Sequence, residues 1–177
     1  FYLGDRMEIL DLYDRYRRKT GKTYIRGDVM PPNTYRLIVH VLIFGRDGRL
    51  LIQQRKAEKT MGGLWDITCG GACQSGENTD QAASRELYEE LGIAFNFRGS
   101  RPILTANFKY GFDDFYMIHK NVRLEDLRLQ EEEVCDARWA SYDDVIDLMK
   151  RGKFVKYKKS FIDLLFDLEK DKRFMEI

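Results

Sequence analysis

The sequence predicts an α/β fold, and two observations support this prediction. Apolar runs of strand length lie on both sides of one capped helical segment at residues 79–91, and two further helical segments follow toward the C-terminal side. A length of 177 residues suits one domain with a buried core. We expect an N-terminal extension over residues 1–33 and a main domain over 34–177, because Pro31-Pro32 marks a boundary.

The N-terminal extension has the alternation of a β-hairpin. Residues 7–13 and 22–26 predict two short strands, joined by a basic loop that ends in Thr20-Gly21. Such strands bury little apolar surface by themselves. We therefore expect the hairpin to dock on the main domain or on a partner subunit, and a homodimer is one expectation.

The main domain begins with strands. Residues 35–44 predict a long apolar strand, and the turn at 45–48 leads into a strand over 50–55, which together predict a hairpin. A further strand over 64–68 leads into a loop at Gly70-Gly71 and then into the first helix. We expect Phe44 and Trp65 to lie in the core.

The first helix has clear ends. Asn78 is a suitable N-cap with Gln81 three residues later, and Gly92 follows the last helical turn. Beyond it, residues 103–110 and 115–122 predict a second hairpin around Gly111, and residues 139–141 a short strand. Helices are predicted near 143–151 and 160–170, the last with one apolar side made of Phe161, Leu164, Leu165 and Leu168.

Three carboxylates share one flank of the first helix. At about 100° per residue, Ala83 and the leucines that follow it form an apolar sector, and Glu90 lies about 20° outside that sector. Glu86 and Glu89 lie farther round. Like charges so placed repel and raise the pKa of at least one carboxyl, and a bound divalent cation removes that repulsion. A solvated acidic face is the alternative.

Residues 71–93 resemble the Nudix box, the signature of a family of pyrophosphate-bond hydrolases. Its pattern G-x5-E-x7-R-E-U-x-E-E-x-G-U, in which U is a bulky aliphatic residue, is filled at every fixed position: Gly71, Glu77, Arg85, Glu86, Leu87, Glu89, Glu90, Gly92 and Ile93. The resemblance implies an α/β/α sandwich with a mixed sheet. The N-terminal hairpin is similar to an extension found in one bacterial branch of the family.

The resemblance also implies a function. It is the hydrolysis of a diphosphate linked to another group, with Mg²⁺ or Mn²⁺ as cofactor and water as the attacking group. By the family's pattern, Glu86, Glu89 and Glu90 are metal ligands together with the backbone carbonyl of Gly70. Glu77 and Arg85 form a supporting ion pair. A nucleoside diphosphate derivative is the substrate class that we expect first.

The general base is expected outside the box. In several family members it is a loop glutamate a few residues before a tryptophan-bearing strand, and Glu133 has that position relative to Trp139. Glu86 and Glu89 are rival bases. Three consecutive glutamates, 131–133, are also typical of a solvated loop.

Two other functions remain as alternatives. A domain of the same fold that binds a nucleotide or sugar phosphate without cleaving it is one, although such domains usually lose box carboxylates. Isopentenyl diphosphate isomerase is the other and is less favoured, because its catalytic cysteine falls at Gly70 and its histidine ligands fall at Ala72 and Arg36.

Composition narrows the class of partner. A formal net charge of +1 argues against a surface for nucleic-acid polymers or membranes, so we expect a small-molecule diphosphate substrate. No apolar run has the length of a membrane span, and charges are scattered through the first thirty residues, which predicts a cytoplasmic protein. Cys69, Cys73 and Cys135 are odd in number and predict reduced thiols near the sheet.

Overall fold

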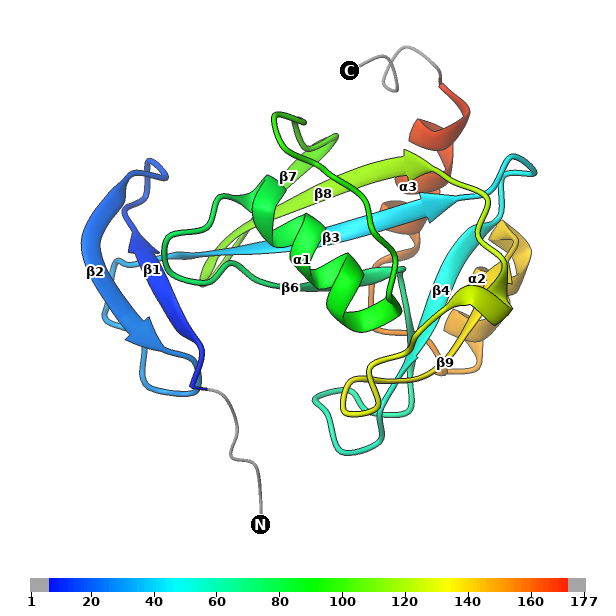
Figure 1. Ribbon diagram of the computed structural model, residues 1–177, viewed down its shortest axis with the longest axis horizontal. Coiled ribbons are helices and arrows are strands. Elements are labelled where there is room, and N and C mark those ends of the chain that lie inside the picture. The colour runs from blue at the N-terminus through cyan, green and yellow to red at the C-terminus, as the bar shows by residue number, and fades with distance from the viewer. Residues whose placement is uncertain (1–6, 172–177) are drawn as a thin grey trace.

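The computed structural model describes residues 7–171, and Figure 1 shows a separate two-stranded hairpin beside a larger sheet that helices cover. The hairpin pairs β1 (Ile9–Tyr13) with β2 (Lys19–Ile25) in antiparallel register. The predicted strands are confirmed, but β2 begins three residues early. Thr20-Gly21 therefore lies in the strand, because pairing with β1 extends as far as Tyr13 and Lys19.

Within residues 7–171, seven strands form the main sheet, and it is mixed. The long β3 pairs in parallel with β8, whereas the other pairs are antiparallel. The strands are β3 (Arg36–Phe44), β4 (Leu50–Arg55), β5 (Trp65–Asp66), β6 (Cys69–Ala72), β7 (Leu104–Phe108), β8 (Gly111–His119) and β9 (Val134–Ala140).

Of two local predictions about this sheet, one is confirmed only in part and the other is wrong. The hairpin expected over 35–55 exists only at its turn, because β3 and β4 meet at the single pair Phe44 and Leu50. Beyond that pair, β4 pairs with β9, and β3 pairs with β6 instead. The glycines at 70 and 71 belong to β6 rather than to a loop, since His40 and Val39 of β3 pair with them.

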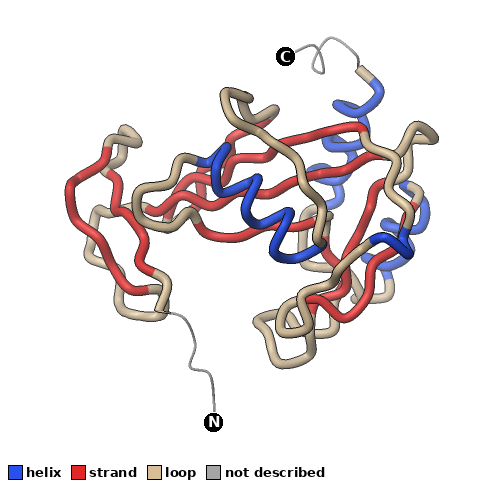
Figure 2. Tube along the Cα trace, in the orientation of Figure 1, coloured by secondary structure: helices blue, strands red, loops and turns tan. Residues whose placement is uncertain are grey.

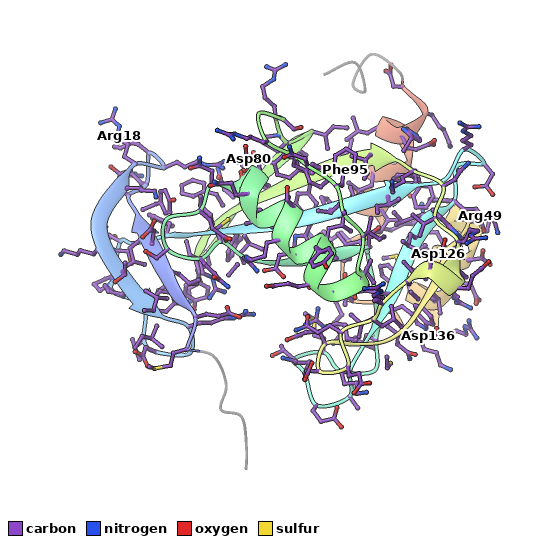
Figure 3. The ribbon with its side chains drawn as sticks, viewed as in Figure 1. Arg18, Arg49, Asp80, Phe95, Asp126 and Asp136 are labelled. Atoms are coloured by element: carbon purple, nitrogen blue, oxygen red, sulfur yellow. The ribbon has the colours of Figure 1, made fainter. Side chains whose placement is uncertain are left out.

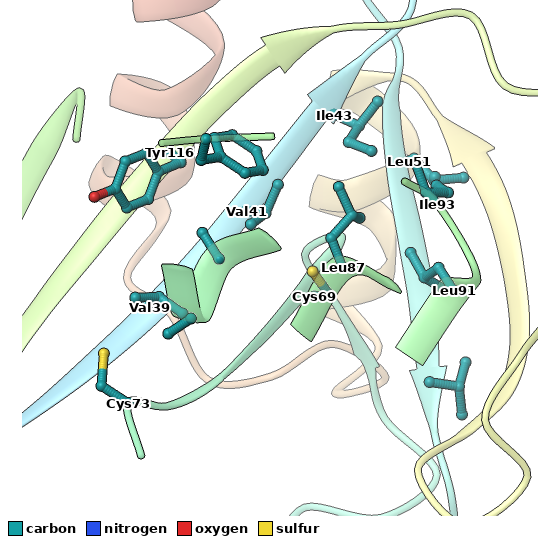
Figure 4. Packing of buried hydrophobic residues seen from close by; sticks show 14 of the residues in the cluster. Val39, Val41, Ile43, Leu51, Cys69, Cys73, Leu87, Leu91, Ile93 and Tyr116 are labelled. Carbon is teal, nitrogen blue, oxygen red and sulfur yellow. The ribbon is translucent and has the colours of Figure 1, made fainter. Parts of the chain in front are cut away.

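Helices cover both faces of the sheet, which confirms the α/β/α sandwich. Helix α1 (Thr79–Leu91) packs on the face formed by Val39, Val41 and Ile43, as Figure 4 shows for Leu87 and Leu91. Helices α2 (Tyr142–Lys150) and α3 (Lys159–Lys170) pack on the opposite face, where Leu42 and Phe44 point. Figure 2 draws these helices in blue and the strands in red. A short 3-10 turn, Leu124–Asp126, precedes β9.

The ends of the helices follow the sequence signals closely, and α1 matches its predicted range. Asn78 and Gln81 form a capping box, and Gly92 takes the left-handed conformation, with φ of 70°. Toward the C-terminal side the prediction was less accurate, because β9 begins at Val134 rather than at Trp139. On α3, Leu164 is 41% exposed, and Ile162 and Phe166 are buried in its place.

The hairpin docks on the main domain, as one of the two predicted alternatives requires. Its inner residues Leu10, Leu12 and Tyr24 form a small core with Ala72 of β6. Tyr13 also exchanges backbone hydrogen bonds of 2.7 and 2.9 Å with Tyr35. The hairpin thus lies against the segment that leads into α1.

The cysteines are free thiols, but only two of them are packed against the sheet. Cys69 and Cys73 are buried, and burial raises the pKa of each thiol, which disfavours the reactive thiolate form. Cys135 is exposed on β9. No helix within residues 7–171 is long and apolar enough to cross a membrane.

Candidate functional site

The carboxylates of α1 sit at different depths along one flank of the helix. Glu90 is 6% exposed and borders the buried leucines, as the helical geometry predicts. The side chain of Glu86 is 13% exposed, and that of Glu89 is 41% exposed. The flank therefore runs from a buried carboxyl to one in contact with solvent.

Glu90 is the most perturbed acid of this group. Burial raises its pKa to about 8, and the nearby charge of Glu86 adds to the effect. The amide of Gln53 donates a hydrogen bond of 2.6 Å to Glu90 Oε2, which opposes the shift without cancelling it. The other end of that amide, Gln53 Oε1, is buried and has no hydrogen-bond partner among the described residues. This corner thus has one buried acceptor without a donor, next to a carboxyl whose charge is disfavoured.

Arg85 holds the loop before α1 against the helix. Its Nε and Nη2 donate to the two oxygens of Glu77, at 2.7 and 2.9 Å, and Nη2 also reaches the carbonyl of Ala72 at 3.1 Å. Glu77 in turn accepts from the backbone N–H of Gln74. The ion pair expected between Glu77 and Arg85 is present. Arg85 Nη1 additionally donates to Glu86 and Glu89, at 2.8 and 3.0 Å.

The two glycines of β6 are required by their neighbours. A Cβ on Gly71 would lie 2.2 Å from a carboxylate oxygen of Glu86, so a side chain there would displace this carboxylate. A Cβ on Gly70 would lie 2.4 Å from the ring of His40. That ring is fixed by a 2.7 Å contact with Asp113 and by stacking on Phe115.

These groups line one pocket of about 500 Å³. It contains six of the seven residues predicted for the site, namely Gly70, Arg85, Glu86, Glu89, Glu90 and Glu133. Glu77 is not among the lining residues, because it lies behind Arg85. The other lining residues are Glu8, Arg26, Gln53, Arg55, Lys59, Gly71, Gln74, Gln130 and Glu132.

Glu133 lies on the loop that leads into β9, as the sequence suggested. Its side chain is 33% exposed and forms an ion pair with Lys59, which comes from the loop after β4. The charge of Glu133 also contributes to the raised pKa of Glu90, after the larger contributions of burial and Glu86. The loop therefore brings a fourth carboxylate to the group on α1.

Sequence reasoning missed Gln53, Glu8 and Arg26. Gln53 had a weak signal, because it is an amide directly after the apolar run Leu-Leu-Ile, and the structure buries it. Glu8 and Arg26 had none, because their presence depends on how the hairpin docks. Arg55 and Lys59 also line the pocket and add two basic side chains to it.

The donor set suits a divalent cation, although its side chains are not gathered around one point. Among the described residues, no three His, Cys, Asp or Glu side chains form a ready group of metal ligands. The reason is visible in the hydrogen bonds, because Arg85 holds Glu86 and Glu89 while Gln53 holds Glu90. Carboxylate and carbonyl oxygens are nevertheless the donors that Mg²⁺ and Mn²⁺ prefer, and the unpartnered Gln53 Oε1 adds one more.

The chain is similar to known proteins over most of its length. Residues 34–165 match the NUDIX domain. A Nudix hydrolase of Listeria monocytogenes is 42% identical over 164 residues, which are 92% of this chain and 96% of that relative. An isopentenyl-diphosphate Delta-isomerase of Pectobacterium atrosepticum is 32% identical over 150 residues, covering 78% of this chain and 79% of the relative. A crystal structure from Deinococcus radiodurans shares the fold, with a TM-score of 0.72 at 22% identity over 88% of this chain and 98% of that chain.

The chain is more similar to the Listeria relative than to the isomerase. The domain match contains the whole box and the sheet around it, and the Listeria relative aligns along nearly its full length. The isomerase is similar at lower identity over a shorter stretch. The chain belongs to the Nudix hydrolase family.

Proposed function

We propose that this chain is a metal-dependent pyrophosphohydrolase, which cleaves a diphosphate linked to another group by attack of water on phosphorus. The observation that carries the proposal is the gathering of Glu86, Glu89, Glu90 and Glu133 in one pocket that also contains basic side chains. A metal-bound diphosphate carries both signs of charge, and a pocket lined by carboxylates and cations matches both.

Three groups of α1 and one backbone carbonyl would hold the metal. Glu86 and Glu90 are the principal ligands in this proposal, with Glu89 and the carbonyl of Gly70 beside them. Mg²⁺ or Mn²⁺, when bound, neutralises phosphate charge and lowers the pKa of a bound water. Glu86 and Glu89 exchange their contacts with Arg85 for that role, while Glu77 keeps Arg85 in place through its two remaining hydrogen bonds.

Glu133 is the general base that we propose. Its carboxylate takes a proton from the attacking water while the water oxygen bonds to phosphorus and the bridging P–O bond breaks. Two observations support it: Glu133 lines the same pocket, and the ion pair with Lys59 holds its side chain there. Glu86 and Glu89 are the rivals, but in this proposal both are ligands of the metal.

The pocket suits the diphosphate part of a substrate. Every lining residue among those described is charged, an amide or a glycine, so the pocket has no aromatic side chain on which a base would stack. We infer that selection for the group beyond the diphosphate occurs outside these walls. Nucleoside diphosphate derivatives therefore form the first panel to test, beside compounds in which a sugar or a second phosphate replaces the nucleoside.

Isomerisation is disfavoured by the surroundings of Gly70. The cysteine of the isomerase family falls at this position, where the ring of His40 lies 2.4 Å from any added Cβ. Binding without turnover has no such obstacle, and it is separated from hydrolysis by the assay below.

The test is product release from a panel of diphosphate compounds with Mg²⁺ or Mn²⁺, by the wild type, Glu133→Gln and Glu131→Gln. Glu131 is exposed and does not line the pocket, so it serves as the matched control. We expect one compound class to be cleaved, and kcat to fall by roughly 10²-fold or more in Glu133→Gln alone. A change confined to KM would assign the base elsewhere, and binding of the panel without cleavage by the wild type would contradict hydrolysis.

A further inference from the structure

The N-terminal hairpin contributes a wall of the pocket. Glu8, just before β1, and Arg26, just after β2, line it together with the carboxylates of α1. The two residues are neighbours, since the backbone N–H of Arg26 donates to the carbonyl of Glu8 at 2.9 Å and their side chains form an ion pair at 2.7 Å. Both lie outside residues 34–165, which match the NUDIX domain.

The hairpin is fixed relative to α1 by the loop that precedes the helix. Asp11 of β1 accepts hydrogen bonds from the Ser75 hydroxyl at 2.7 Å and from the Gly76 N–H at 3.0 Å. The carbonyl of Ile9 also accepts from the Ser75 N–H at 2.7 Å. Because this loop contains Glu77, the contacts that attach the hairpin also fix the position of the hairpin relative to the box.

Arg26 is the cation of the pocket that is most free to bind a ligand. Arg85 donates to Glu77, Glu86 and Glu89, whereas Arg55 donates to the carbonyl of Thr60 and to Asp66. The side chain of Arg26 is 53% exposed, and among the described residues it hydrogen-bonds only Glu8, which is itself 33% exposed. Ion pairs at such exposure contribute little to stability, so a phosphate can displace Glu8 easily.

Carboxylates on several sides of the pocket stabilise the charge of Arg26. Burial opposes this charge, but the hydrogen bond with Glu8 and the charges of Glu8, Glu86 and Glu133 outweigh it and raise the pKa of Arg26. Arg26 therefore remains charged on the side of the pocket that faces the carboxylates of α1 and of the loop before β9.

We propose that Arg26 binds a phosphoryl oxygen of the substrate's diphosphate, which makes the N-terminal hairpin a substrate-binding element of this enzyme. The proposal rests on the function proposed above. A guanidinium suits this role because its planar donors match phosphate oxygens in pairs. The phosphate replaces Glu8 as the partner of Arg26, while the carboxylates of α1 bind the metal ion.

The test is calorimetric titration with inorganic pyrophosphate in the presence of Mg²⁺. The proteins are the wild type, Arg26→Ala, Arg26→Lys and the control Arg18→Ala. Arg18 is an exposed arginine of the same hairpin. Figure 3 shows Arg18 at one end of the hairpin, and Figure 1 shows that β2 ends at the other. We expect Arg26→Ala to weaken the Kd for pyrophosphate by about 10-fold, Arg26→Lys to restore part of that loss, and Arg18→Ala to match the wild type.

A second titration, with Mn²⁺ alone, separates a specific loss of phosphate binding from a general change in structure. We expect Arg26→Ala to bind Mn²⁺ no more weakly than the wild type and to keep the wild-type Tm, since Arg26 contacts no proposed metal ligand. Loss of either in Arg26→Ala would mean a structural role and would overturn the proposal. An unchanged Kd for pyrophosphate would also overturn it while leaving the hydrolase function intact. Failure of the wild type to bind pyrophosphate and to cleave any compound of the panel would overturn both.

Discussion

At the scale of single residues, Glu90 shows how the position of a side chain on a helix changes its pKa. Its place next to the apolar sector of α1 puts its carboxyl under the sheet, where burial raises its pKa to about 8. One hydrogen bond from Gln53 does not compensate for the lost water. A carboxyl kept in this condition gains most from a bound cation, which suits a metal ligand better than a structural residue.

The raised pKa of Glu90 predicts how stability depends on pH when metal is chelated. In the unfolded chain this carboxyl titrates at about 4.3, so between about pH 4.3 and 8 the native state holds more protons than the unfolded state. Stability therefore falls as pH rises through this window, by an amount on the order of a few kcal/mol. Burial also raises the pKa of Glu86, which acts in the same direction.

Thermal unfolding in chelator at pH 5.5 and pH 8 checks this prediction. We expect the Tm of the wild type to drop between the two, and the drop to be smaller in Glu90→Gln, which has no proton to lose. Added Mg²⁺ restores more of the wild-type Tm at pH 8 than at pH 5.5, because the metal binds the ionised form. Equal pH profiles for the two proteins would contradict the assignment of the raised pKa to Glu90.

The box residues could be predicted from the sequence because their relations are local. Glu77, Arg85 and the carboxylates of α1 lie within fourteen residues of one another, so helical spacing and the family's pattern suffice to place them. Gln53 and Arg26 lie far from the box in sequence and reach the pocket only through strand pairing and hairpin docking. Local patterns contain no information about such contacts.

At the scale of elements, the hairpin has a second attachment away from the pocket. Arg17 Nη1 donates to Asp114 Oδ1 of β8 at 2.9 Å, and its other nitrogen contacts the second oxygen. Asp114 is 1% exposed and is also bonded by Thr105. Because a buried carboxylate without its cation is costly, this pair fixes the hairpin against the sheet.

Arg17→Ala is therefore predicted to destabilise the protein by about 1–3 kcal/mol, since it leaves Asp114 with one hydrogen bond in a buried place. Urea unfolding measures the effect, and Arg15→Ala, an exposed arginine two residues earlier, is the control. Equal stability of the two variants would show that the Arg17 pair does not hold the hairpin.

The segment before α1 shows where element prediction failed. Two adjacent glycines are typical of a loop, yet they extend as β6 because β3 offers a partner and because the neighbouring side chains leave no room for a Cβ. Helix α1 was predicted correctly because its capping residues and its apolar spacing act within the helix itself. Strand partners depend on distant segments, so the pairing of β4 with β9 had no local signal.

At the scale of the whole molecule, the pocket lies where three separate parts of the chain meet. The box helix supplies carboxylates, β4 and the loops after it and before β9 supply Gln53, Lys59 and Glu133, and the hairpin supplies Arg26. The sandwich fixes the first two parts relative to each other, and the loop before α1 fixes the third. The hairpin and the main domain therefore form one functional unit in the proposed mechanism.

The most direct test of this account is the turnover of the best diphosphate compound by Glu90→Gln beside Glu125→Gln, each with saturating Mg²⁺. Glu125 is 71% exposed and lies outside the pocket, so its variant controls for the loss of a surface charge. We expect Glu90→Gln to lower kcat/KM by at least about 10²-fold with its fold retained, and Glu125→Gln to equal the wild type. Near-wild-type turnover by Glu90→Gln would contradict the claim that the carboxylates of α1 hold the metal for hydrolysis.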